Sequence, residues 1–170
     1  ATAYCNWLNS QYGNLYSGMI FRPPTEAEWE YSCRAGTTSR RYWGDDLQTN
    51  QSAAYANTAD LSAKNKWPDW IVFHCDDGYV ASSPVGSFLP NAFGLYDMMG
   101  NVWELCQDWY GNYESTPQTD PKGPMNGSTR VGRGGCWCPA VCYVRSASRD
   151  DWKIDSTSML LGFRIVLAKN

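Results

Sequence analysis

The feature that most constrains this chain is how early its helical pattern ends. Only the first 36 of its 170 residues contain stretches with helical periodicity. In residues 2–12 the apolar and aromatic side chains recur at three- and four-residue spacing, which predicts an amphipathic helix that stops at Gly13. The face of this helix carries Ala3, Tyr4, Trp7, Leu8 and Tyr12.

A second helix is marked by its termini. Thr25 is a typical N-cap, and Glu28, three residues later, completes a capping box. Glu30 and Arg34 have the spacing of an ion pair along one helix face. Gly36 is expected to form the C-terminal cap. The stretch from Pro23 to Gly36 is therefore predicted to be a short, well-capped helix.

Beyond Gly36 the sequence is rich in Gly, Pro, Asn, Asp and Ser, and four short apolar runs interrupt it. These runs predict short strands at residues 70–75, 84–88, 101–110 and 161–168. Long loops are uncommon in a compact domain unless they bind something or are held in place. A chain of this length suits one hydrophobic core. The sequence thus predicts one α+β domain with two helices, short strands and some device that holds its loops.

Charge and hydropathy argue against a nucleic-acid partner and against a transmembrane segment. The net charge is −3 and no Lys/Arg cluster is present, so we expect no nucleic-acid partner. The mean hydropathy is −0.50 and no long apolar run occurs, so we expect no transmembrane segment. No signal peptide is visible, and a chain that starts at Ala1 without Met is expected to be a mature or trimmed product.

Seven cysteines are present, so at least one is free, metal-bound or paired with another molecule. Four of them are scattered and are predicted to be small buried hydrophobic side chains: Cys5, Cys33, Cys75 and Cys106. The other three, Cys136, Cys138 and Cys142, lie within seven residues around Trp137. This cluster could be a redox or metal centre, a disulfide staple, or a surface that happens to contain sulfur.

Five motifs in order carry a family resemblance: "FRPPTEAEWEYSCRAG", "NAFGLYDMMGNVWEL", "RGGCW", "RSASR" and "LGFR". The chain from Ala3 to Val166 resembles the formylglycine-generating-enzyme (sulfatase-modifying factor) family. The resemblance implies a C-type-lectin-like α+β fold and a single domain over residues 1–170. Members usually begin with further strands before the first helix, and here the chain starts at that helix. Their absence would leave an edge of the last strand, residues 161–168, exposed.

The resemblance also implies two structural calcium sites that would hold the loops. At the first, Asn57 and Asp77 would supply side-chain oxygens and Thr58 and Tyr79 carbonyls. At the second, Asp97 and Glu104 would supply carboxylates and Gly100 and Val102 carbonyls. Calcium takes six to eight such oxygens in flexible geometry. The alternative is that Asp77 and Gly78 form a plain turn and that Glu104 is a charge on a strand face.

One function that the resemblance implies is oxidation of a sulfatase cysteine to formylglycine by a copper(I) centre. Soft thiolates suit Cu(I), and the local candidates are Cys138 and Cys142. The sequence departs from the enzyme pattern here. Pro139 stands where the enzymes have His, the loop is shorter, and the single histidine, His74, is distant in sequence.

The function we favour is a non-catalytic binding surface. Short-loop relatives include the variable proteins of diversity-generating retroelements, in which adenine replacement changes Ser and Asn codons. Trp137, Ala140, Arg145 and Arg149 match the family framework, and we expect Trp137 to be packed in the core. The side chains between and after them would vary and contact a ligand: Cys136, Cys138, Pro139, Val141, Cys142, Tyr143, Asp150, Asp151, Trp152, Ser158 and Met159.

A third possibility is a scaffold with a fixed partner, in which a Cys138–Cys142 or Cys136–Cys142 disulfide staples the loop. Under the favoured hypothesis the partner is a protein or glycan on another cell or particle. The resemblance then implies an extracytoplasmic or surface-displayed setting.

Overall fold

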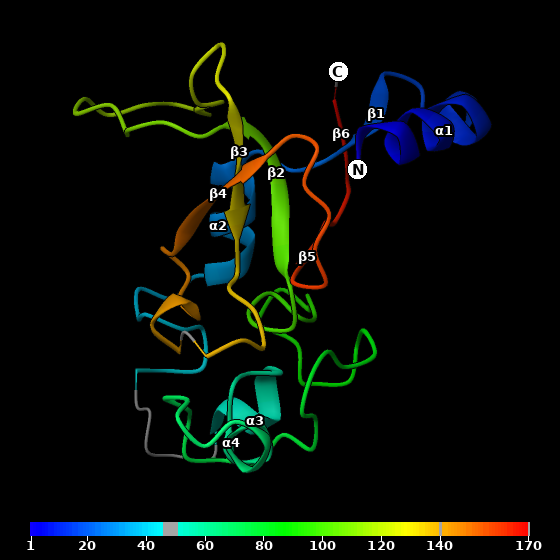
Figure 1. Cartoon of the computed structure of the whole chain (residues 1–170). Helices are drawn as coiled ribbons and strands as arrows, with labels where there is room; N and C mark the ends of the chain where they lie inside the picture. Colours follow the sequence, from blue (N-terminus) through cyan, green and yellow to red (C-terminus); the bar gives the residue numbers. More distant parts are fainter. Residues whose placement is uncertain (46–50, 140, 170) are drawn as a thin grey trace.

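The computed structural model describes residues 1–45, 51–139 and 141–169. It is a mixed α+β domain with a four-stranded sheet at its centre and a two-stranded sheet beside it (Figure 1). The elements in chain order are α1 (Thr2–Tyr12), η1 (Gly13–Leu15), β1 (Met19–Arg22), α2 (Glu26–Arg34), α3 (Gln51–Tyr55), α4 (Leu61–Lys66), β2 (Trp103–Trp109), β3 (Thr129–Arg133), η2 (Val141–Tyr143), β4 (Arg149–Lys153), β5 (Leu161–Gly162) and β6 (Val166–Lys169).

Both predicted helices are confirmed. At the start of α2 the Thr25 hydroxyl accepts the Glu28 N–H, and the Glu28 carboxylate accepts the Thr25 N–H. Glu30 and Arg34 form the expected ion pair at 2.7 Å. The helix ends slightly earlier than predicted, because Ala35 takes the left-handed conformation of the C-cap before Gly36.

The central sheet has the order β4-β3-β2-β5, and α2 covers one of its faces. Alternate residues of β2 are buried on the α2 side, in the pattern expected for a strand with one covered face. The core between them contains large side chains such as Trp29, Met98 and Val131. The four scattered cysteines are buried and free, as predicted.

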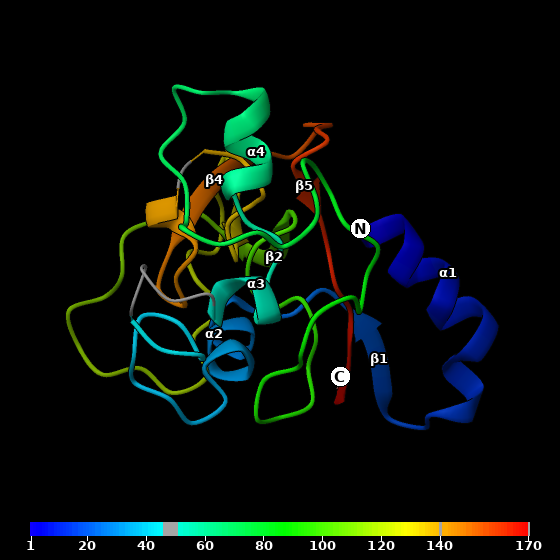
Figure 2. The ribbon, with the colours of Figure 1, turned by 90° about the horizontal axis from the view of Figure 1, so that it is seen from below.

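The predicted C-terminal strand is split in two. Leu161 and Gly162 pair in parallel with β2, whereas Val166–Lys169 pairs antiparallel with β1. Strand β1 pairs with one edge of β6, and within the described residues no strand pairs with its other edge. Asn9 fastens α1 to this small sheet, since its side-chain amide both accepts from and donates to the backbone of Phe21. The start of α1 and strand β6 both lie on the side of the molecule that carries this small sheet (Figures 1 and 2).

The loop-rich region differs from the sequence prediction in detail. Residues 70–75 and 84–88 form no strand, whereas α3 and α4 are short helices that were not predicted. Helix α4 begins at an N-cap, since Asp60 accepts the N–H of Ser62 at 2.9 Å. Strands β1, β3 and β4 were also missed. Figure 2 shows α3, α4 and the surrounding loops crossing the end of the central sheet.

Candidate functional site

Two loops and the cysteine segment meet at Gly100 and Asn101. The N–H of Gly100 donates to the carbonyl of Gly134, and that of Asn101 donates to the carbonyl of Asn57. The N–H of Trp137 in turn donates to the carbonyl of Asn101. Gly100 has φ +75°, and a Cβ there would lie 2.1 Å from the Asn57 oxygen. The backbone at this junction thus ties the first predicted metal segment to the cysteine loop.

The structure brings the four residues of the first predicted calcium set together. Asp77 accepts the N–H of Thr58 at 2.8 Å and that of Tyr79 at 2.9 Å. The side-chain oxygens of Asn57 and Thr58 are buried and have no hydrogen-bond partner within the described residues. Burial raises the pKa of Asp77 to about 7, and the nearby Asp60 and Asp76 add to this, against the opposing effect of the Thr58 and Tyr79 N–H groups.

This donor set fits a hard cation. It combines a half-buried carboxylate, an amide oxygen that lacks a donor, and adjacent backbone carbonyls, which are the ligand types calcium prefers. When bound, the ion would supply the positive charge that Asp77 lacks and would hold residues 57–58 against residues 77–79. The neighbouring Asp60 is engaged elsewhere, since it caps α4 and accepts the N–H of Asp77.

At the second predicted calcium site, an arginine side chain already neutralises the carboxylate of Glu104. Both carboxylate oxygens of Glu104 accept from the guanidinium of Arg164, at 2.5 and 2.6 Å, and one also accepts from the Trp29 indole. Arg164 further donates to the carbonyl of Asp97, whose carboxylate accepts the Gly86 N–H. Gly100 and Val102 lie on the turn between Asp97 and β2. Calcium at this set would have to displace the guanidinium.

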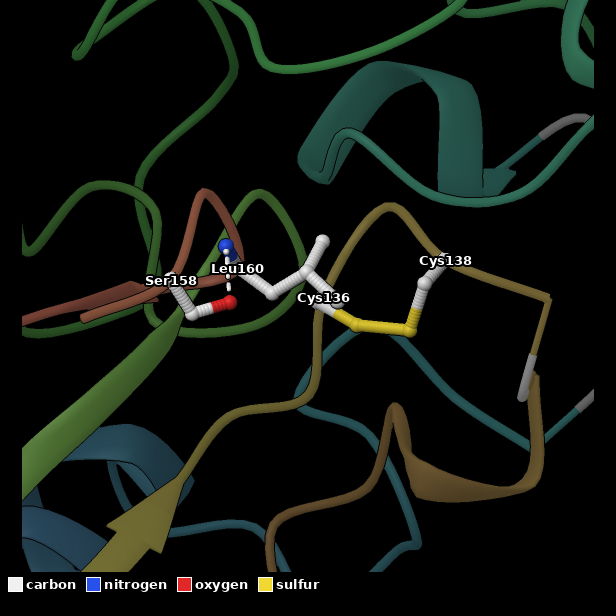
Figure 3. Close-up of a disulfide and its surroundings, with 4 residues drawn as sticks. All are labelled: Cys136, Cys138, Ser158 and Leu160. Carbon is white, nitrogen blue, oxygen red and sulfur yellow. Dashed lines mark hydrogen bonds between the residues drawn. A yellow bond between two sulfur atoms is a disulfide. The ribbon is translucent and has the colours of Figure 1, made fainter. Parts of the chain in front are cut away.

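The cysteine loop is closed by a disulfide between Cys136 and Cys138 (Figure 3). The two staples considered from sequence, Cys138–Cys142 and Cys136–Cys142, are therefore not the pairing found. Cys142 is exposed and is among the free cysteines. Cys136 is buried, at 2% exposure, so its predicted role as a ligand contact is wrong. Its position directly after the buried Gly134–Gly135 turn explains the burial.

The other predicted ligand contacts in this loop differ in how exposed they are. Pro139 is exposed and Cys138 is half-buried. Val141 begins η2, but its side chain lies outside the described residues, as does all of Ala140. Among the described residues, no group of three or more His, Cys, Asp or Glu side chains is arranged to hold a metal ion.

Trp137 is confirmed as a core side chain, with 8% exposure. Its ring stacks near those of Trp67 and Trp70, with centroids 5.9 and 6.2 Å away. Trp67 and Trp70 stack on each other at 4.3 Å. Aromatic pairs at such distances contribute beyond the area they bury. The cysteine loop thus rests on a tryptophan cluster that sequence reasoning missed, although "WPDW" within an otherwise polar stretch was a usable signal.

Two of the expected framework arginines hold the ends of the segment that follows the cysteines. The Nε of Arg145 donates to the carbonyl of Cys142 at 2.6 Å. Arg149 forms two hydrogen bonds of 2.7 Å with the carboxylate of Glu26 on α2. Such bidentate pairs fix geometry as well as adding energy. The backbone around Tyr143 is therefore anchored on both sides.

Strand register decides which residues of β4 share a face. Cross-strand partners lie on the same face, so Asp150, opposite Gly132, and Trp152, opposite Arg130, lie away from α2. The Trp152 ring lies over Gly132, where a Cβ would come within 2.6 Å of it. Asp151 is exposed but is paired with the core residue Val131, so it lies on the α2 side, apart from its neighbours.

Trp103 joins the two separated parts of the predicted surface. Its N–H donates to the carbonyl of Leu160 at 2.8 Å, and its ring contacts that of Tyr143 edge-on at 5.8 Å. Figure 3 shows Ser158 and Leu160 beside the Cys136–Cys138 disulfide. Met159, between them, is 78% exposed. Sequence reasoning had placed Trp103 in a strand but had assigned it no role.

The fold and this loop arrangement define a C-type-lectin-like domain, held together by loop junctions rather than by extended sheets. The chain belongs to the family described as "Sulfatase-modifying factor enzyme 1-like domain", which matches residues 1–169.

Curated relatives include formylglycine-generating enzymes. The mouse protein is 40% identical over 169 residues, covering 96% of this chain and 41% of the relative. The Streptomyces coelicolor protein is 39% identical over 170 residues, covering 96% and 48%. The chain is also 34% identical to a Chlamydia pneumoniae protein named serine/threonine-protein kinase pkn1, covering all of this chain and 22% of that one. It therefore spans less than half the length of these relatives.

Two solved structures resemble the domain. PvdO from Pseudomonas aeruginosa superposes with a TM-score of 0.76 at 30% identity, covering 99% of this chain and 58% of that one. Treponema denticola variable protein 1 superposes with a TM-score of 0.69 at 29% identity, covering 89% and 48%. No helix in the described part of the chain is long and apolar enough to cross a membrane.

Proposed function

We propose that this chain is a non-catalytic display module that binds a ligand through a variable C-terminal surface. We call this surface the C-terminal patch and define it as Pro139, Cys142, Tyr143, Asp150, Trp152, Ser158 and Met159. The family membership and the likeness to a variable protein of Treponema denticola support the proposal. Loops on a rigid scaffold are where recognition is commonly found.

The observation that carries the proposal is the division between exposed and buried side chains after the cysteines. Cys142 and Tyr143 are exposed, whereas Val144, Ser146 and Ser148 are at most 2% exposed. A surface that changes while the fold persists needs such a division, because substitutions at exposed tips rarely cost stability. The patch side chains can thus vary without disturbing the segment that anchors them.

The cysteine geometry favours display over the oxidase alternative. That alternative needs Cys138 and Cys142 as a pair of thiolates that hold copper(I). Here the Cys138 sulfur is bonded to Cys136, and Cys142 is a free, exposed cysteine. Several relatives are named formylglycine-generating enzymes, and this chain spans less than half of their length.

The proposed function also includes a bound calcium ion and an extracytoplasmic setting. We infer that one calcium ion held by Asn57, Thr58, Asp77 and Tyr79 stiffens the loops below the patch. A disulfide is typical of oxidising compartments, which supports an extracytoplasmic or surface-displayed setting. The ligand would be a protein or glycan, since a patch with Tyr, Trp, Asp and Met side chains suits such partners.

The proposal is tested with two displayed libraries of this chain. One randomises Pro139, Cys142, Tyr143, Asp150 and Met159, and the matched library randomises the buried Val144, Ser146 and Ser148. We expect most patch variants to stay folded and to yield binders to an immobilised protein panel, while most variants of the matched library unfold. Equal loss of folding in both libraries would contradict the proposal.

The oxidase alternative has its own readout. Copper(I) titration, combined with thiol-dependent oxygen consumption on a cysteine-containing sulfatase peptide, should give no activity for a display module. Turnover that disappears in Cys138→Ser and Cys142→Ser variants would instead establish the oxidase. At the gene level, an adjacent near-copy of the 3′ coding segment that differs only at adenines would support display.

A further inference from the structure

A large cavity lies on the other side of the sheet from the C-terminal patch. The loop between β2 and β3 projects from the sheet and returns to it (Figure 1). Between this loop and the outer side of α2 is a cavity of about 750 Å³, within the range of small-ligand sites. A neighbouring hollow of about 400 Å³ shares Ala27, Tyr31, Pro121 and Lys122 with it. We call the two together the α2 groove.

The loop wall of the groove is anchored. The guanidinium of Arg149 donates to the carbonyl of Gly111 at 2.8 Å, and the Tyr113 hydroxyl donates to Glu26 at 2.9 Å. A Cβ at Gly111 would lie 2.6 Å from the Pro124 ring, so the two arms of the loop contact each other. A wall fixed in this way gives a preformed site, which lowers the entropic cost of binding.

Several of the charges that line the groove form ion pairs with one another. Glu26 is paired with Arg149, and Glu30 with Arg34. Across the larger cavity, the acidic residues Glu26, Glu30, Asp108 and Glu114 nearly balance the basic residues Arg34, Lys122 and Arg149. A strongly charged ligand would find no opposing excess of charge here, and the balance therefore favours a neutral one.

What remains for a ligand is aromatic surface and neutral hydrogen-bonding groups. Tyr31 and Tyr113 are 69% and 63% exposed. The Arg149 guanidinium lies over the Tyr113 ring, 4.0 Å from its centroid, so a ligand would contact the remaining exposed surface of that ring. Neutral polar side chains also line the cavity: Asn112, Thr116 and Gln118. Ring faces combined with groups that donate and accept suit a neutral molecule with many hydroxyls.

We propose that the α2 groove binds a neutral oligosaccharide. The C–H faces of its sugar rings would stack on Tyr31 and Tyr113, and its hydroxyls would bond the polar side chains of the loop. The groove continues past Tyr31 into the second hollow, so it suits a linear chain of several rings rather than a single sugar. This site is separate from the C-terminal patch and does not depend on the proposed display function.

The test uses the intact chain and four neutral tetrasaccharides: β-1,4-linked glucose, N-acetylglucosamine and xylose, and α-1,4-linked glucose. Saturation-transfer NMR and calorimetry measure binding at up to about 10 mM sugar, the range of weak sites. We expect at least one probe to bind. Tyr31→Ala should weaken that binding about tenfold, as loss of an aromatic anchor does. Because the Tyr31 side chain is mostly exposed, the melting temperature of the Tyr31→Ala variant should stay that of the wild type.

Further variants separate the possible sites. Ala27→Gln places a larger neutral side chain on α2 within the groove and should block binding as well. Tyr16→Ala removes an exposed tyrosine outside the groove, and Met159→Ala alters the C-terminal patch; both should bind like the wild type. The proposal is overturned if none of the four probes binds. It is also overturned if binding survives Tyr31→Ala and Ala27→Gln, or if arrayed peptides rather than sugars compete for the groove.

Discussion

Gly100 is the residue at which the loops of this domain are joined most tightly. A side chain there would meet the Asn57 carbonyl at 2.1 Å, and its φ of +75° also disfavours any residue with a Cβ. We expect Gly100→Ala to lower the free energy of unfolding by about 3 kcal/mol or more, because strain and overpacking add. Urea denaturation followed by tryptophan fluorescence measures the loss.

Gly94 provides a matched control for Gly100. Its φ is +76°, nearly the same, but nothing lies within 4 Å of the position its Cβ would take. Gly94→Ala should therefore cost only the backbone strain, about 1 kcal/mol. If both variants lose the same stability, the junction at Asn57 is not what requires glycine.

Asp77 is the residue that tests calcium binding. Wild-type protein should melt at a higher temperature with calcium than with EDTA, because an ion that binds only the folded state stabilises it. Asp77→Asn should remove this calcium-dependent shift. The exposed Asp69→Asn serves as the control and should keep it. An unchanged melt of the wild type in EDTA would contradict the calcium proposal.

At the scale of elements, α2 depends on the charge of one capping residue. The ion pair with Arg22 lowers the pKa of Glu28 to about 2, against an ordinary value of 4.5, and the Thr25 N–H adds to this despite some burial. A carboxyl with a lowered folded pKa stabilises the protein above pH 4.5, and the contribution disappears as the pH falls toward 2.

Glu28→Gln should therefore destabilise the protein at neutral pH and make little difference near pH 2. Since the Glu28 side chain is 41% exposed, solvent screening keeps the effect small, about 1 kcal/mol or less. Thermal melts of both proteins between pH 2 and 7 give the comparison. A constant difference across this range would mean that the ionised carboxylate is not the stabilising form.

For the whole molecule, Trp103 connects the sheet to the C-terminal patch. It is 4% exposed and contacts both Tyr143 and the segment at Leu160. Trp103→Ala should cost about 3–5 kcal/mol, as large core truncations do, and should speed hydrogen exchange at residues 158–161. Trp7→Ala, with a side chain 49% exposed on α1, should change neither measurement much.

How far the sequence predicted the site depends on the residue. Thr25, Glu28, Glu30 and Arg34 lie within one helix, so their contacts were readable from spacing. The position of Arg164 on Glu104 was not readable, since 60 residues separate them. The pairing of Cys136 with Cys138 was also open, because cysteine spacing does not fix connectivity.

The strands show the same limit. The run at residues 101–110 became β2, but the more apolar run at 70–75 formed no strand, because a strand exists only where a neighbour accepts its hydrogen bonds. β3 and β4 have few apolar residues and were missed, yet β3 pairs with β2 near the centre of the sheet and β4 pairs with β3 at its edge. β-propensity reflects packing against neighbours more than the strand's own sequence.

The sequence by itself determined the family, the α+β class, the first two helices, the capping of the second, and the burial of the scattered cysteines, since these follow from local hydrogen bonding, side-chain spacing and ordered motifs. Only the tertiary structure decided which cysteines pair, that Arg164 neutralises Glu104, and that Asp150 and Trp152 share a face with Trp103 while Asp151 does not. These features depend on contacts between segments far apart in the chain, and such contacts exist only once the loops are folded around the junction at Gly100.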